Sequence, residues 1–306
     1  MDRVRPLVIL LGTQVALGLI LTTLALTGTL DDITESLAGD DREQQAGPAR
    51  VNRFDEARAF AWLRRQVELG PRPAGSRTSR RLATMIRGAL RNGAYQRVPG
   101  DLRNVVGRVE GRDPKRVVVV GAHYDTKDLP GFVGANDGAA GTAAVIELAR
   151  SIRPRELGPT VVFILFDGEE SPRGAPDDRF EQEGLRGSRV AARRYRGAEA
   201  MVLLDFVANR GLRLPREAQS DARLWGRLRT AAGRVGAGRA FPDSTQGAIS
   251  DDHLPFIRAG VPSIDLIDGN FLNGPCWHRR CDDLRGVSAR DLDLAGESVR
   301  ELLRLL

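Results

Sequence analysis

A run of apolar residues that ends in acidic residues constrains the fold of this sequence more than any other stretch. Val161–Phe166 (VVFILF) is followed at once by Asp167-Gly168 and by two adjacent glutamates, Glu169 and Glu170. A short, continuous apolar run closed by glycine is typical of a strand buried on both faces that ends in a tight turn. Carboxylates just after such a strand lie at the edge where open α/β folds place their sites. We expect one glutamate to bind a metal and the other to move protons, whereas the alternative is a solvated loop.

Predicted helices alternate with predicted strands along residues 51–306. The helical patterns cover residues 54–63, 79–90, 138–151, 184–194, 222–234 and 289–306. The strand patterns cover residues 104–110, 116–121, 160–166, 200–206 and 262–267, and a turn is expected at 111–114. This alternation predicts an α/β sandwich with helices on both faces of the sheet. No internal repeat and no second domain with its own pattern is found.

The N-terminal segment predicts a membrane anchor. Residues 7–30 carry no charge, and a membrane helix needs about 20 apolar residues. Because Arg3 and Arg5 precede the segment, the positive-inside rule places the N-terminus in the cytoplasm and the rest outside. A cleaved signal peptide is the alternative, and it also exports the domain. We therefore expect an anchor at 1–30, a linker at 31–50 and an extracytoplasmic catalytic domain at 51–306.

The charge pattern does not indicate a nucleic-acid-binding protein. The formal net charge is +6 and the pI about 10.1, but only Lys115 and Lys127 are lysines. The arginines are scattered, often beside acidic residues, and no long basic run interleaves with aromatic residues. We interpret the positive charge as an arginine-rich composition and expect no nucleic-acid partner.

The two cysteines, Cys276 and Cys281, bracket His278 in the sequence CWHRRC. Two cysteines are too few for a disulfide scaffold, so the choices are one local disulfide or two free thiols. The predicted export of the domain favours the disulfide.

The three histidines all lie in predicted loops or at strand ends, and each is near an aspartate. His123 stands in GAHYD, His253 in SDDHLPF and His278 in CWHRRCDD. A single histidine is more often a surface or core residue than a ligand, but the shared setting of all three argues for a function.

Two aspartates complete a possible ligand set. Asp137 lies in the glycine-rich GANDGAAG, although an aspartate in a turn is common. Asp205 follows an apolar run, where a buried carboxylate needs a cation or hydrogen bonds. With His123, Glu170 and His278 they form a histidine and carboxylate set that suits catalytic zinc. No GxSxG, Walker-type or dinucleotide-type glycine motif is present.

These segments, in this order, resemble the zinc-dependent M28 exopeptidases and, within them, the glutaminyl cyclases (glutaminyl-peptide cyclotransferases). The motifs are GAHYDT (121–126), FVGANDGAAG (132–141), FDGEES (166–171), GLRGSR (184–189), LLDFVA (203–208), SDDHLPFIRAGVP (250–262) and CWHRRCDD (276–283). The resemblance implies a three-layer sandwich whose central sheet is mixed and mostly parallel, as in zinc exopeptidases. It covers the chain from about Phe54 to its C-terminal end.

The resemblance also implies roles for individual residues. The ligands of a single catalytic zinc correspond to Asp137, Glu170 and His278, and the general acid/base corresponds to Glu169. Carboxylates around the transferred proton correspond to Asp205 and Asp251. The walls of the substrate pocket correspond to Trp277, Phe271 and His253.

Two activities match this pattern. A cyclase would convert the N-terminal glutamine of a peptide or protein to pyroglutamate and release ammonia. An M28-type aminopeptidase would hydrolyse N-terminal residues, with a second zinc at His123 and Asp205 and a bridging Asp137. Because all five positions are present, the ligand count alone allows one zinc or two. A third and remote alternative is a membrane-tethered binding domain with a relict site.

The chain departs from the cyclase pattern around the expected pocket. No tryptophan follows the Glu-Glu pair, Asp265 replaces a histidine, and Ser250 replaces a glutamine. These differences concern the pocket more than the metal ligands.

Overall fold

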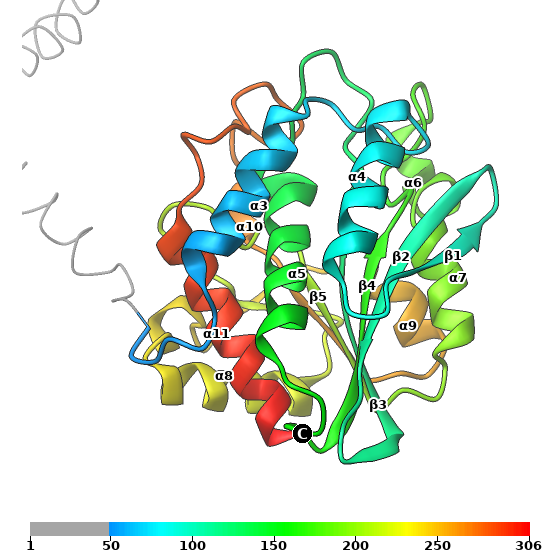
Figure 1. Cartoon of the computed structure of the whole chain (residues 1–306). Coiled ribbons are helices and arrows are strands. Elements are labelled where there is room, and N and C mark those ends of the chain that lie inside the picture. The colour runs from blue at the N-terminus through cyan, green and yellow to red at the C-terminus, as the bar shows by residue number, and fades with distance from the viewer. Residues whose placement is uncertain (1–48) are drawn as a thin grey trace, which may run out of the picture. The chain divides into compact units, whose positions relative to one another are not determined.

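The computed structural model describes residues 49–306, whose chain forms one compact unit (Figure 1). The predicted anchor and nearly all of the predicted linker lie outside the described residues. Within residues 49–306, no helix has the length and apolar character needed to cross a bilayer.

A mixed six-stranded sheet forms the centre of the domain, in the order β1-β2-β4-β3-β5-β8. The strands are β1 (Ala94–Val98), β2 (Leu102–Val109), β3 (Asp113–His123), β4 (Pro159–Phe166), β5 (Ala200–Leu204) and β8 (Ser263–Leu266). The pairs β4-β3, β3-β5 and β5-β8 are parallel, whereas β1-β2 and β2-β4 are antiparallel. A separate parallel pair joins β6 (Arg216–Glu217) to β7 (Thr245–Gln246). The expected mixed, mostly parallel sheet is confirmed.

Helices cover both faces of this sheet (Figure 1). One face packs against α3 (Glu56–Glu68), α4 (Arg77–Ala89), α5 (Gly141–Ser151), α8 (Ala222–Val235) and α11 (Ala289–Leu305). The other face packs against α7 (Arg186–Arg194) and α9 (Leu254–Arg258). Along β3, Val118 and Val120 enter the first core and Val119 the second, as the two-residue period of a strand requires. The short helices α6 (Phe180–Glu183) and α10 (Gly269–Leu272) lie in the connections.

The sequence patterns missed the edge strand β1. Its residues, AYQRV, include a single buried side chain, Val98, because the strand lies at the margin of the sheet. An edge strand that buries so little lacks the apolar alternation from which strands are recognised. The turn expected at 111–114 is also shorter than predicted, since Asp113 and Pro114 already belong to β3.

A kinked turn precedes α5, where an unbroken helix from Gly138 was expected. Residues Ala135–Ala140 form this turn, and Asp137 and Gly138 have non-helical backbone angles within it. Gly138 has φ +89°, and a Cβ there would lie 2.7 Å from the carbonyl oxygen of Asp125. Glycine therefore lets this turn approach the end of β3 closely.

The half-buried carboxyl group of Asp293 predicts a pH-dependent stability. Burial, and next the charges of Glu297 and Glu56, raise the pKa of Asp293 to about 7. The unfolded chain has an aspartate pKa near ~3.9, so the folded state binds more protons between roughly pH 4 and 7. Stability therefore falls as pH rises through this window. Asp293→Asn should raise the free energy of unfolding at pH 8 by ~1–2 kcal/mol, a value reduced for partial exposure.

Urea unfolding at pH 5 and pH 8 measures this effect. The exposed control Asp101→Asn should show the same change in unfolding free energy between the two pH values as the parent chain. If Asp293→Asn also left this change unaltered, the raised pKa of Asp293 would be contradicted.

Candidate metal site

The carboxyl ends of three neighbouring parallel strands bring the predicted site residues to one edge of the sheet. His123 ends β3, Glu169 and Glu170 follow β4, and Asp205 follows β5. The order β4-β3-β5 makes these ends adjacent. Asp137 arrives from the kinked turn before α5.

Asp137 lies between two histidines. Its Oδ2 is 3.5 Å from Nε2 of His278, which in turn is 3.3 Å from Oε1 of Glu170. Its Oδ1 is 3.4 Å from Nε2 of His123, which is also 3.4 Å from Oδ1 of Asp205. Asp137–Glu170–His278 and His123–Asp137–Asp205 thus form two triads, each with ligand atoms within 4.8 Å of one another. Asp137 belongs to both.

The polar atoms of these triads would be satisfied better by a metal ion than they are by hydrogen bonds among themselves. His123 Nε2, Asp137 Oδ2 and Glu170 Oε1 are buried without a hydrogen-bond partner. Buried polar atoms are rarely left unpaired, and a cation satisfies several of them at once. Imidazole nitrogens with carboxylate oxygens are a donor set typical of catalytic zinc.

Backbone hydrogen bonds fix the orientation of these side chains. Nδ1 of His123 lies 3.1 Å from the carbonyl oxygen of Asp125, which leaves Nε2 facing the carboxylates. The carboxylate of Asp125 accepts bonds from the N–H groups of Glu169 (3.3 Å) and Glu170 (3.2 Å). The carboxylate of Asp282 likewise accepts hydrogen bonds from the N–H groups of Asn136 (2.8 Å) and Asp137 (3.1 Å).

Asp125 and Asp282 were missed as functional residues, although both lie within the recognised motifs GAHYDT and CWHRRCDD. Each is buried, as is Arg72 beneath them. Arg72 donates to the carbonyl oxygens of Val133 (2.7 Å) and Gly134 (3.1 Å), on the segment that leads to Asp137. Burial lowers the pKa of Arg72 to about 10, and the nearby carboxylates of Asp282 and Asp137 oppose that shift.

The two adjacent glutamates have different electrostatic environments. Burial raises the pKa of Glu169 well above its ordinary value; His123 opposes this shift and Glu170 adds to it. Burial would also raise the pKa of Glu170, but the interaction with His278, 3.3 Å away, and the charge of Lys127 outweigh it. The pKa of Glu170 is therefore below its usual value, as expected of a ligand, whereas Glu169 is suited to hold a proton.

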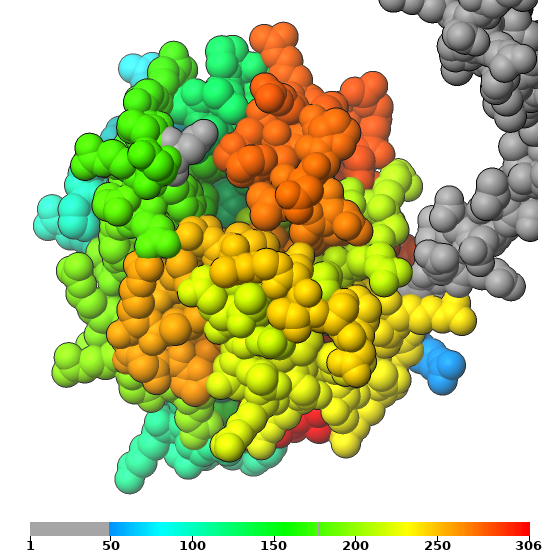
Figure 2. Space-filling model, turned by 180° about the vertical axis from the view of Figure 1, so that it is seen from behind, coloured from blue at the N-terminus to red at the C-terminus, as the bar shows by residue number. Residues whose placement is uncertain are grey.

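A cavity of about 480 Å³ opens onto this site. In Figure 2 a recess lies between the green segment near residues 170–180 and the orange segment near 270–280. Its acidic wall contains Glu169, Asp205 and Asp251, and its apolar wall contains Phe206, Ile249, Ile267, Leu272 and Trp277. Trp277 is 39% exposed and stacks on His278, with ring centroids 4.2 Å apart.

Two residues expected in the pocket wall lie behind it. Phe271 is not among the lining residues and packs against Phe206, with centroids 4.9 Å apart. His253 is fully buried, with Nε2 3.2 Å from Glu217 and Nδ1 3.6 Å from Asp265. The prediction that His253 faces the substrate is therefore wrong, because these two buried carboxylates hold its ring inside the domain.

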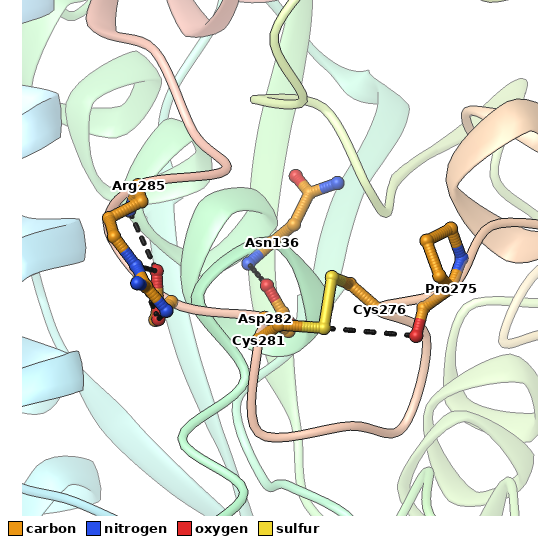
Figure 3. The surroundings of a disulfide bond; sticks show 7 residues. Asn136, Pro275, Cys276, Cys281, Asp282 and Arg285 are labelled. Carbon is orange, nitrogen blue, oxygen red and sulfur yellow. Dashed lines mark hydrogen bonds and ion pairs between the residues drawn. A yellow bond between two sulfur atoms is a disulfide. The ribbon is translucent and has the colours of Figure 1, made fainter.

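The structure joins Cys276 to Cys281, with 5.2 Å between their Cα atoms (Figure 3). This disulfide closes the loop that carries Trp277 and His278.

The mixed sheet with a cavity at its carboxyl edge, and the two triads that share one aspartate and could hold a metal ion, form the kind of site found in α/β enzymes. Residues 104–303 match the model of Peptidase family M28, and the chain belongs to this family.

The relatives include two kinds of protein. The glutaminyl-peptide cyclotransferase of Bothrops jararaca is 30% identical over 223 residues, which cover 58% of this chain and 59% of that protein. The chain thus matches less than two thirds of that relative's length. The structure of Porphyromonas gingivalis glutaminyl cyclase gives a TM-score of 0.72 at 28% identity, covering 83% of this chain and 99% of that one. The structure of a leucine aminopeptidase precursor from Bacteroides thetaiotaomicron gives a TM-score of 0.74 at 25% identity, covering 84% of this chain and 99% of that one.

The environment of His253 predicts a large effect on stability. Burial alone would raise the pKa of Glu217, but hydrogen bonds from His253 and from the Gln219 N–H outweigh it, so the pKa is lowered. His253→Ala leaves this buried, ionised carboxylate without its nearest side-chain partner and should cost ~3–5 kcal/mol of unfolding free energy. Urea unfolding measures the loss. The double variant His253→Ala/Glu217→Gln should lose less than the sum of the single variants, whereas simple additivity would contradict a direct interaction.

Proposed function

We propose that the chain is a zinc-dependent glutaminyl-peptide cyclotransferase-like enzyme. Its reaction would convert an N-terminal glutamine to pyroglutamate, with the α-amine displacing ammonia from the side-chain amide. The relatives named glutaminyl cyclase support this activity, and a cavity of about 480 Å³ is within the range of small-molecule sites.

The observation that carries the proposal is the position of Asp251 in the same acidic wall as Asp205. Burial, and next the charges of Asp205 and Asp252, raise the pKa of Asp251 well above its ordinary value. Oδ2 of Asp251 has no hydrogen-bond partner among the described residues. We therefore assign Asp251 to the proton transfer in this wall, with Asp205 beside it as a hydrogen-bonding carboxylate rather than as the ligand of a second metal.

This assignment leaves Asp137, Glu170 and His278 as the residues that would hold one zinc ion. When bound, zinc would supply Lewis-acid polarisation of the substrate's amide carbonyl. Glu169 would take a proton from the attacking α-amine and return one to the leaving ammonia, because its carboxyl group faces the cavity and its pKa is raised. Trp277 and Ile267 would hold the glutamine chain, and the enclosed walls would exclude water, which would otherwise hydrolyse the amide.

A zinc aminopeptidase is the second candidate, and one observation favours it. The His123–Asp137–Asp205 triad is assembled with its ligand atoms within 4.8 Å, as a second metal would need. In that enzyme Glu169 would instead activate a water molecule. A relict binding domain is the least supported alternative, since the buried Glu169 and both triads are assembled.

The substrates would be peptide or protein N-termini outside the cytoplasm. This location follows from the uncharged segment at 7–30, which we propose as the membrane anchor. We propose no nucleic-acid partner for the chain. The joined cysteines agree with an oxidising compartment.

Two peptides that differ only in their first residue, Gln or Leu, distinguish the activities. With the zinc-loaded chain we expect the Gln peptide to lose ammonia and keep its length, and the Leu peptide to stay unchanged, as followed by mass spectrometry. Glu169→Gln should retain zinc and lower kcat at least ~100-fold, the scale of general acid–base catalysis. Release of leucine would instead identify an aminopeptidase.

The number of zinc ions tests the assignment of Asp205. The purified chain should bind one zinc tightly, as measured by metal analysis after dialysis. His278→Ala should abolish this binding, whereas the matched variant His123→Ala should retain it. Two tightly bound ions, one of them lost in His123→Ala, would favour the aminopeptidase.

A further inference from the structure

His278 is the ligand of its triad with the least support from regular structure. It lies in the loop between α10 and α11, and its side chain is 22% exposed, against 3% for Asp137 and 4% for Glu170. Its backbone has φ +53°, a conformation that residues with a side chain rarely adopt. Metal-binding histidines usually donate their second nitrogen to a fixed acceptor, but no hydrogen bond within residues 49–306 holds Nδ1 of His278. Its ring instead packs against Trp277 (centroids 4.2 Å apart), which lies in the same loop, and against Phe132 (5.8 Å).

The loop around His278 is closed on itself. The N–H of Arg279 donates to the carbonyl oxygen of Cys276 (3.0 Å), and the N–H of Asp282 donates to that of Arg279 (3.0 Å). The disulfide between Cys276 and Cys281 spans the same segment, as Figure 3 shows. His278 therefore lies inside a small covalent ring that restricts the backbone conformations open to it.

The same ring also reaches the second ligand of the triad. Asp282 directly follows Cys281, and its carboxylate accepts the N–H groups of Asn136 and Asp137. Its carbonyl oxygen accepts the N–H of Ala135 (3.3 Å). Figure 3 places Asp282 next to the disulfide and facing Asn136. A displacement of Cys281 would thus move the residue that orients Asp137 as well as the loop that carries His278.

We propose that the Cys276–Cys281 disulfide is a positioning element of the metal site, so that reducing it weakens metal binding while the domain stays folded. The inference rests on the ligand triad used in the proposed function. The main cluster of the hydrophobic core contains no residue of this loop, and Cys276 packs only on the small cluster of Phe206, Ile267 and Phe271. Residues 274–283 can therefore loosen without unfolding the sheet.

The reducing step can be carried out with a trialkylphosphine. Phosphorus donates two electrons to the disulfide, the S–S bond breaks, and each sulfur takes a proton. The oxygen of one water molecule is transferred to phosphorus, which gives a phosphine oxide and two thiols. Because free thiols can bind zinc themselves, the double variant Cys276→Ser/Cys281→Ser provides the thiol-free counterpart.

The test measures zinc affinity of the full chain by competition with a chromogenic chelator, and folding by circular dichroism. We expect the double serine variant to bind zinc ~10–100-fold more weakly than the oxidised chain, the scale found for residues that orient metal ligands. Its circular dichroism spectrum should match that of the parent. As controls, the phosphine should have no effect on the serine variant, and Asp282→Ala should weaken zinc binding with the disulfide intact.

Two outcomes would overturn the proposal. One is a zinc affinity of the serine variant that lies within twofold of the parent's, which would show that the disulfide does not position the metal ligands. The other is loss of zinc together with loss of the folded spectrum, which would make it a general support of the fold. Because zinc affinity is measured rather than turnover, this result is independent of whether the enzyme is a cyclase or an aminopeptidase.

Discussion

The carboxylate of Asp137 is the contact on which the candidate site depends. One of its oxygens faces His123 and the other faces His278, so a single side chain joins both triads. This is possible because the turn Ala135–Ala140 is kinked at Asp137 rather than helical, and because Asp282 holds the N–H groups of that turn. In a regular helix the carboxylate would be directed along the helix surface and could not lie between two histidines.

Around Asp137, the domain buries several carboxyl groups close together. Glu169, Glu170 and Asp205 surround it, while Lys127 is the one lysine near them, 3.3 Å from Glu170. Such crowding is costly unless protons or a metal ion compensate it. Burial raises the pKa of Glu169, and the charges of Glu170 and Asp251 add to this shift against His123, so the carboxylates that favour a cation also favour a proton on Glu169. Metal binding and proton transfer are in this sense consequences of one arrangement of charge.

The parts of the structure that could be predicted are those with a strong local pattern. The apolar runs of β3, β4 and β5 identified the central strands, and the acidic or histidine residues just after them identified the edge of the site. The edge strand β1 buries one side chain and has no comparable pattern. The kink at Asp137 was missed because it depends on how closely the turn approaches β3, and that contact is set by tertiary structure.

The pocket was predicted less well than the ligands, for a related reason. Position next to a functional residue in the sequence does not determine the direction of a side chain. Asp251 faces the cavity, whereas His253, two residues later, faces Glu217 inside the domain. Asp125 and Asp282 act through backbone N–H groups, and no residue pattern reveals which N–H groups a carboxylate will reach.

Within this ligand set, the choice between the two activities depends on Asp205. If its carboxylate binds a second metal with His123, the site has two metals and suits hydrolysis. If it instead lies only among the carboxylates of the cavity wall with Asp251, the site has one metal and a group of carboxylates beside it. Asp205 has both neighbours in this chain: Nε2 of His123 lies 3.4 Å from its Oδ1, and the buried carboxyl group of Asp251 lines the same cavity.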